Sequence, residues 1–219
     1  MRVGIVKEIK TGEGRVALTP PMATELVAAG AELWIESGAG ATARFDDGAY
    51  AAAGARVVED AAEVWAHADL LLKVKEPLPS EYRHFRNGMT LLAFLHVAGN
   101  RSLAQALIER QVTAIAAELV SFEDEYRPIL EPMLEIAGHM GMILAVAHSA
   151  STTGGRGKIV GGIAGIAPAR IRILGANTMA FEAARTACAL GADVFLLDPD
   201  ERRLRQARRL VRRRPLSLT

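Results

Sequence analysis

Short apolar runs alternate with amphipathic segments along most of this chain. The apolar runs are rich in Val, Ile and Leu, as buried parallel strands are, and we assign them to residues 3–6, 32–36, 56–58, 70–74, 89–95, 112–116, 171–174 and 194–197. Segments with apolar residues at helical spacing separate them, at 21–29, 61–66, 79–85, 103–110, 132–150 and 179–190, with a short helix near Tyr50. This order predicts an α/β fold with a parallel, doubly wound sheet covered by helices on both faces.

The stretch from Arg170 to Asp200 has the order strand, glycine turn, helix, strand and acid. That order is typical of the βαβ unit that binds dinucleotides, in which the helix N-terminus holds the pyrophosphate and the acid binds the ribose hydroxyls. We therefore predict an amino-terminal domain over residues 1–135, followed by a linker helix and a partial Rossmann βαβ unit over 136–219. The boundary lies inside the long helix predicted at 132–150.

The glycine fingerprint of that unit departs from the pattern G-x-G-x-x-G/A. Gly175 supplies the turn, Ala180 is tolerated at the third position, and Asn177 replaces the second glycine. A Cβ at residue 177 intrudes where the backbone comes closest to the phosphates. Because asparagine tolerates a positive φ, the turn can keep its shape while dinucleotide affinity falls.

Composition and charge narrow the class of protein. Half of the residues are hydrophobic and the formal net charge is +1, which is ordinary for a globular protein. Cys188 is the only cysteine, which excludes an intramolecular disulfide and a cysteine-rich metal site and fits a reducing compartment. The first residues lack a signal-peptide core, and no apolar run reaches the ~18 residues of a membrane span. We expect a cytoplasmic protein with no metal site and no membrane contact.

The segment after Glu201 is crowded with arginine and carries no further acid. One interpretation is a patch for nucleic acid or another anionic partner. The other is a solvated, arginine-rich helix with a frayed end. Without interleaved aromatic residues or a nucleic-acid-binding motif, the solvated helix is favoured and no nucleic-acid partner is expected.

Four side chains with useful chemistry follow predicted strands. Arg15, Lys75, His96 and Glu118 come after the strands at 3–6, 70–74, 89–95 and 112–116. Ligand sites of parallel sheets lie beyond the carboxyl ends of the strands. Two cations there suit a small carboxylate substrate, and a histidine can transfer a proton near neutral pH. The alternative remains that the arginine and lysine are solvated and the histidine is structural.

Several segments carry a family resemblance. They are VKEIKTGEGRVALTP, LLKVKEPLPSEY and LLAFLH, together with the pairing of EPMLEIAGHM with ILGANTMAFEAARTACALGADVFLLD. In these segments the chain resembles bacterial NAD-dependent alanine dehydrogenase, with the α subunit of proton-translocating transhydrogenase as a related, weaker match. The likeness runs from the first residue to about Arg205.

The resemblance implies a reaction and a role for each site residue. Alanine is oxidatively deaminated to pyruvate and ammonia, or the reverse, and hydride passes between the substrate and NAD. By position, Arg15 binds the substrate carboxylate, Lys75 holds the carboxylate or polarises the carbonyl, and His96 acts as acid and base. Met133 lines the cleft. The resemblance implies that the cofactor is bound by Gly175, Asn177, Ala180, Asp198 and Arg203. Of these, Asp198 holds the adenosine ribose and favours NAD over NADP, and Arg203 lies near the adenine.

Departures from the family pattern leave three interpretations open. Leu134 stands where the family has a cofactor-contacting serine, and family members continue well beyond Thr219 with the second half of the nucleotide sheet and a catalytic aspartate. We expect a copy truncated on its carboxyl-terminal side. The first interpretation is a working alanine dehydrogenase, or one half of a split enzyme. The second is a non-catalytic module that binds keto or amino acids or interacts with another protein. The third is an inactive copy. The partners expected are the small-molecule substrate, further copies in a homo-oligomer, or a chain supplying the missing half.

Overall fold

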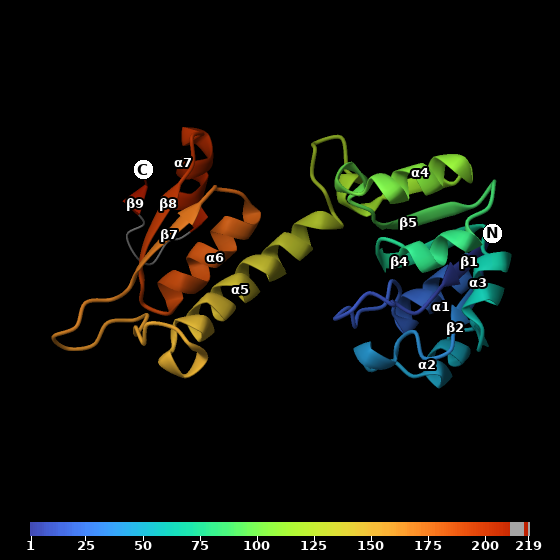
Figure 1. Ribbon diagram of the computed structural model, residues 1–219, viewed down its shortest axis with the longest axis horizontal. Coiled ribbons are helices and arrows are strands. Elements are labelled where there is room, and N and C mark those ends of the chain that lie inside the picture. The colour runs from blue at the N-terminus through green and yellow to red at the C-terminus, as the bar shows by residue number, and fades with distance from the viewer. Residues whose placement is uncertain (211–216, 219) are drawn as a thin grey trace. The chain divides into compact units, whose positions relative to one another are not determined.

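The computed structural model describes residues 1–210 and 217–218, and it divides into two units, Met1–Phe122 and Glu123–Thr219 (Figure 1). In the first unit, six parallel strands form one sheet in the order β3-β2-β1-β4-β5-β6. The strands are β1 Arg2–Ile5, β2 Glu32–Glu36, β3 Arg56–Val58, β4 Leu70–Lys75, β5 Thr90–Phe94 and β6 Thr113–Ala116. The predicted doubly wound α/β fold is confirmed.

Helices connect these strands and cover the sheet. They are α1 Pro20–Ala28, α2 Asp47–Ala52, α3 Ala61–His67 and α4 Arg101–Glu109, with short 3-10 turns η1 Ala41–Ala43, η2 Pro79–His84, η3 Val97–Gly99 and η4 Ala117–Leu119. One core contains Ile5, Leu33 and Tyr50, and the other contains Trp65, Leu71 and Leu91. Because side chains alternate between the faces of a strand, neighbouring residues of one strand enter different cores.

The strand order reverses between β1 and β4. From β1 the chain runs outward through β2 and β3, and it then returns to place β4 on the other side of β1. In open α/β sheets, ligands bind beyond the carboxyl ends of the strands at such a reversal. The loop after β1 and the end of β4 therefore define the ligand edge of this unit.

The second unit begins with the long helix α5 Leu130–Ser149, followed by the turn η5 Ser151–Thr153. The parallel sheet β7-β8-β9 comprises β7 Arg170–Leu174, β8 Asp193–Leu197 and β9 Ser217–Leu218. The helices α6 Thr178–Ala189 and α7 Glu201–Leu210 follow β7 and β8. Within the described residues, β7 pairs with β8 alone, so its other edge carries no strand.

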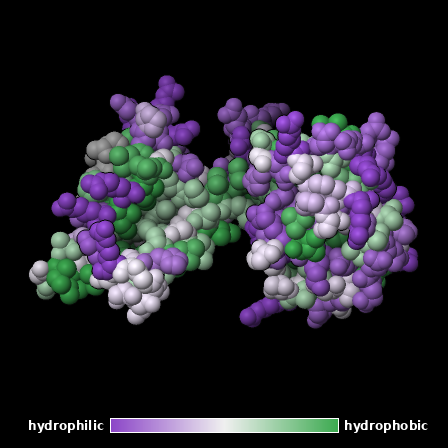
Figure 2. Space-filling view, in the orientation of Figure 1, coloured by the Kyte–Doolittle hydropathy of each residue, from purple (hydrophilic) through white to green (hydrophobic). Residues whose placement is uncertain are grey.

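Helices α5 and α6 pack closely through a glycine. A Cβ built on Gly138 would lie 2.3 Å from the carbonyl oxygen of Met179 and 2.8 Å from the Cβ of Glu182. Elsewhere α5 exposes apolar side chains, including Ile136, Met140, Ile143 and Leu144. In Figure 2 the surface along α5 is accordingly coloured toward the hydrophobic end of the scale.

Helix α5 corrects one expectation from the sequence. Among the described residues, it is the one helix long and apolar enough to cross a membrane by length and composition. The apolar-run criterion missed it because Glu131 and Glu135 interrupt the run. One such helix is weak evidence for a membrane span, because core helices of soluble proteins meet the same criteria of length and composition.

The arginine-rich segment is helical where it is described. Helix α7 covers Glu201–Leu210 and buries Leu204 and Ala207. Residues 211–216 and 219 lie outside the described residues, and the favoured interpretation, a solvated arginine-rich helix with no nucleic-acid partner, stays a prediction. The predicted domain boundary between residues 135 and 136 lies inside α5, whereas the two units meet between Phe122 and Glu123.

Candidate functional site

The loop after β1 and the end of β4 are tied together at the ligand edge of the first unit. Glu8 accepts the N–H of Val74 at 2.6 Å, and Lys10 forms an ion pair with Glu76. Arg15 forms an ion pair with Glu13 at 2.7 Å, and the charge of Lys75 makes a small further contribution to the lowered pKa of Glu13. The structure therefore brings Arg15 and Lys75 to one edge, as their positions after central strands predict.

The Arg15 guanidinium holds the carboxylate of Glu13. Its Nε donates to Oε1 at 2.8 Å and its Nη2 to Oε2 at 2.7 Å. The hydrogen bonds from Arg15, and then the charges of Arg15 and Lys75, lower the pKa of Glu13 from 4.5 to about 2 although burial opposes them, and Glu13 raises the pKa of Arg15. This two-point geometry is how arginine recognises carboxylates in general. A substrate carboxylate would meet the same donors and would compete with Glu13 for them.

His96 follows β5, which is the neighbour of β4. Its backbone has φ +45°, and its N–H donates to Oε1 of Glu118 at 2.7 Å. The ring Nδ1 lies 3.8 Å from the same oxygen, and the His96 side chain is 60% exposed. Glu118 also accepts the N–H of Leu95, so it fixes the backbone on which the imidazole is carried. An exposed imidazole on a fixed backbone is suited to proton transfer with a bound ligand.

Sequence reasoning missed a buried ionic cluster beside Lys75. The Lys73 side chain is 0% exposed, and its Nζ lies 2.9 Å from Glu81 and 3.4 Å from Glu8. Burial raises the pKa of Glu8, and Lys73 opposes that rise. The signal was a lysine inside the apolar run LLLKVK, because a buried cation requires an acidic partner.

Gly175 forms the tight turn between β7 and α6 in the second unit. Gly175 has φ +97°, and no atom lies within 4 Å of the point where a Cβ would stand. Asn177 has φ −101°, so it does not use the positive φ that asparagine tolerates, and it is the N-cap of α6. Its Oδ1 accepts the N–H of Ala180 at 3.0 Å, which removes one of the donors that the helix N-terminus offers to a phosphate.

Asp198 closes this turn from the end of β8. Its Oδ2 accepts the N–H of Ala176 at 2.7 Å and its Oδ1 accepts the N–H of Asp200 at 2.8 Å. The hydrogen bond from Asp200 and that from Ala176 lower the pKa of Asp198, and Arg203 adds its charge at 4.0 Å. Turn, acid and Arg203 thus come together within the second unit.

Residues of α5 contact α6 near its N-terminus. Glu131 accepts a hydrogen bond from the hydroxyl of Thr178 at 2.6 Å, and His139 lies 2.9 Å from Glu182. Met133 is half-buried on the first turns of α5. Its predicted place in a substrate cleft stays a prediction.

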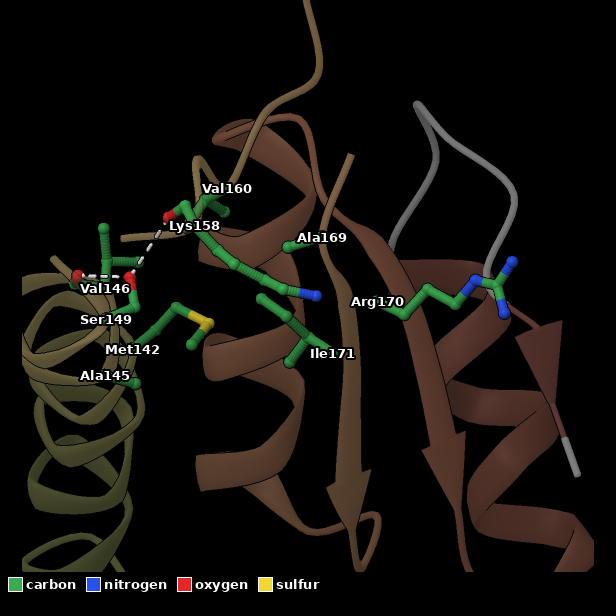
Figure 3. A pocket seen from close by; sticks show the side chains of 9 residues that line it. All are labelled: Met142, Ala145, Val146, Ser149, Lys158, Val160, Ala169, Arg170 and Ile171. Atoms are coloured by element: carbon green, nitrogen blue, oxygen red, sulfur yellow. Dashed lines mark hydrogen bonds between the residues drawn. The ribbon is translucent and has the colours of Figure 1, made fainter. Parts of the chain in front are cut away.

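A pocket of about 300 Å³ lies at the other end of this unit, where β7 begins (Figure 3). Met142, Val146 and Ile171 are among its lining residues, and Lys158 crosses its mouth (Figure 3). No predicted site residue lines it. Within the described part of the chain, His, Cys, Asp and Glu side chains form no group that could hold a metal ion.

Comparisons with known proteins identify two matching family models. Residues 4–137 match the model described as alanine dehydrogenase/PNT, N-terminal domain, and residues 141–218 match alanine dehydrogenase/PNT, C-terminal domain. Alanine dehydrogenase of Mycobacterium tuberculosis (strain ATCC 25618 / H37Rv) is 45% identical over 206 residues, which are 94% of this chain and 56% of that protein. The chain therefore spans little more than half the length of this curated relative.

Two solved structures have a similar fold. An L-alanine dehydrogenase matches with a TM-score of 0.90 and 38% identity, over 100% of this chain and 60% of that chain. A transhydrogenase from Sinorhizobium meliloti matches with a TM-score of 0.81 and 27% identity, over 100% of this chain and 64% of that chain.

Proposed function

Because the chain belongs to the alanine dehydrogenase/PNT family, we propose that it carries the substrate-binding part and the first nucleotide-binding part of an alanine dehydrogenase. The reaction converts L-alanine, NAD⁺ and water into pyruvate, ammonium, NADH and a proton, or the reverse. One observation supports the proposal: Arg15 follows β1 and Lys75 ends β4, and these two strands are neighbours where the strand order of the first unit reverses.

The substrate roles follow from charge and position. Arg15 binds the carboxylate of pyruvate or alanine, for which Glu13 is the internal competitor. Lys75, at the end of β4, donates to the carboxylate or to the keto oxygen and so favours electron withdrawal from the reacting carbon. His96 transfers the proton that accompanies carbonyl or amine formation, supported by its exposed ring above Glu118. For Met133, on α5, we propose only what the family resemblance implies, that it lines the substrate cleft.

The second unit is proposed to hold NAD. Gly175 and the first turn of α6 receive the pyrophosphate, Asp198 the adenosine ribose, and Arg203 lies on the adenine side. Ala180 permits close packing of α6, while the Asn177 cap lowers affinity by occupying one helix donor. Bound NAD supplies the hydride acceptor for alanine oxidation.

The cellular compartment and the partners of the chain are also matters of proposal. We propose a cytoplasmic protein, supported by the single cysteine, Cys188, and by the dehydrogenase relatives. We also propose that further copies or a complementing chain complete the nucleotide half, because β7 has an unpaired edge within the described residues.

Calorimetry with pyruvate tests the substrate site directly. We expect binding at millimolar concentration, lost in Lys75→Ala and kept in Lys7→Ala, which removes a lysine from the same edge of the sheet. An assay of NADH oxidation with pyruvate and ammonium tests turnover by the chain. No pyruvate heat in the unsubstituted chain would refute the substrate site.

A further inference from the structure

A β-bulge interrupts the pairing of β4 with β5 immediately before Lys75. Leu72 pairs with Leu92, whereas Lys75 pairs with Phe94, so β4 has one residue more than β5 over this interval. A bulge leaves one residue outside the ladder and changes the direction in which nearby side chains leave the sheet. The direction of Lys75 therefore depends on what holds the bulge.

Glu8, in the loop after β1, contacts the bulge directly. Its Oε1 accepts the N–H of Val74 at 2.6 Å and lies 3.4 Å from the N of Lys75. Its side chain is 3% exposed. A carboxylate that accepts backbone N–H bonds makes stronger bonds than a neutral acceptor, and burial shields these bonds from water.

The same bulge is held from a second direction. The Nζ of Lys73 donates to Oε1 of Glu81 at 2.9 Å, and Oε2 of Glu81 accepts the N–H of Leu78 at 2.8 Å. Lys73 thereby connects the bulge to the turn η2, while Glu8 connects it to the loop after β1. Lys75 is thus carried on a backbone that is fixed on both sides.

We propose that Glu8 is a positioning residue, which sets the direction of Lys75 by accepting the N–H groups of the bulge. The inference rests on the proposed role of Lys75 in substrate binding. The competing explanation is that Glu8 only neutralises the buried Lys73, from which its Oε2 is 3.4 Å away. The two explanations depend on different properties of the side chain, namely its reach and its charge.

Two substitutions separate reach from charge. Glu8→Gln keeps the length and an acceptor for Val74 but removes the charge, whereas Glu8→Asp keeps the charge but is one methylene too short. For Glu8→Asp we expect pyruvate to bind about tenfold more weakly, and for Glu8→Gln less than about threefold. Glu36→Asp is the matched control, because Glu36 accepts the N–H of Lys7 at 2.8 Å, in the loop after β1 and outside β4.

Backbone amide exchange, followed by NMR on the same variants, needs no ligand. Glu8→Asp should accelerate exchange at Val74, and Glu8→Gln and Glu36→Asp should leave it protected. If the unsubstituted chain does not bind pyruvate, the proposed function is wrong, and the exchange rates still decide whether Glu8 holds the bulge. The inference would be overturned if Glu8→Gln and Glu8→Asp weakened pyruvate binding equally. It would also be overturned if the amide of Val74 stayed protected from exchange in Glu8→Asp.

Discussion

The two units bury the apolar side chains of their strands to different degrees. In the first, the central strands β1 and β4 have a neighbour on each side, and Ile5, Leu33 and Leu71 are at most 1% exposed. In the second, β7 has one neighbour among the described residues, and Leu174 at its end is 82% exposed. When a strand has a neighbouring strand on each side, its apolar side chains can be buried within the unit. When one edge of a strand has no neighbour, part of its apolar surface stays exposed to water.

The polar groups at the two ligand edges differ in the same way. In the first unit, Glu8, Lys73 and Glu81 connect separate loops through buried ionic bonds. In the second, Asn177 and Asp198 each accept a backbone N–H, that of Ala180 within the same helical turn and that of Ala176 from the neighbouring loop. The framework beside Lys75 therefore contains buried ionic bonds, whereas the cofactor turn is held by carboxylate and amide oxygens that accept backbone N–H groups.

The largest effect is expected where the buried ionic cluster is broken. Lys73→Met leaves Glu8 and Glu81 buried without their cation, which should lower the free energy of unfolding of the first unit by about 3–5 kcal/mol. The control Lys10→Met removes a lysine that is 39% exposed in its ion pair with Glu76, and should cost about 0–1 kcal/mol. Urea unfolding of each variant measures both values. If both substitutions lowered the free energy of unfolding by similar amounts, the buried ionic bonds of Lys73 would not stabilise the first unit more than an exposed ion pair does.

The second unit should respond most to its helix crossing. Gly138→Ala places a Cβ against the backbone of α6 and should lower stability by about 1–3 kcal/mol. Gly141, on the same helix, has no atom within 4 Å of its Cβ position, so Gly141→Ala should raise stability by up to about 1 kcal/mol. Amide exchange resolved by unit should show both effects in the second unit alone. A change in the first unit would mean that the two do not unfold separately.

A smaller effect is expected at the cofactor turn. Asn177→Gly releases the N–H of Ala180, and NADH should bind a few-fold more tightly, in line with about 1 kcal/mol for one hydrogen bond. Asn100→Gly is the control, because Asn100 caps α4 of the first unit through the N–H of Leu103 at 3.1 Å. Fluorescence titration with NADH compares the two. Tighter binding in neither variant would remove the Asn177 cap as the reason for weak affinity.

The smallest effect concerns exposed and enclosed ion pairs within the first unit. Arg15 lowers the pKa of Glu13 to about 2, and Arg2 does the same to Asp69. Because both pKa values are depressed, each carboxylate stabilises the fold above its ordinary pKa, and that contribution disappears as the pH falls toward about 2. Glu13 is 7% exposed and Asp69 is 42% exposed, so ~1 M salt should raise the pKa of Asp69 more. NMR titration of the two carboxyl carbons measures this, and equal salt shifts would contradict it.

Much of the fold was predictable, because apolar periodicity reports which residues must leave water. The predicted strand at 32–36 and the predicted helix at 132–150 lie within two residues of β2 and α5. The exposure of α5 was not predictable, because the pattern identifies an apolar face but not whether a neighbour covers it. The capping role of Asn177 was not predicted from the glycine pattern, although asparagine is a common N-cap residue.

The sequence by itself determined the strands, the helices and the residues that follow each strand, because these depend on local periodicity and turn chemistry. It therefore named Arg15, Lys75 and His96 as candidates one by one. Only the tertiary structure decided that the strands before Arg15 and Lys75 are neighbours, that Glu13 occupies the guanidinium of Arg15, and that Glu8 reaches the bulge before Lys75. Those contacts join residues far apart in the chain or depend on how one loop closes, and they form only when the strand order has brought the loops together.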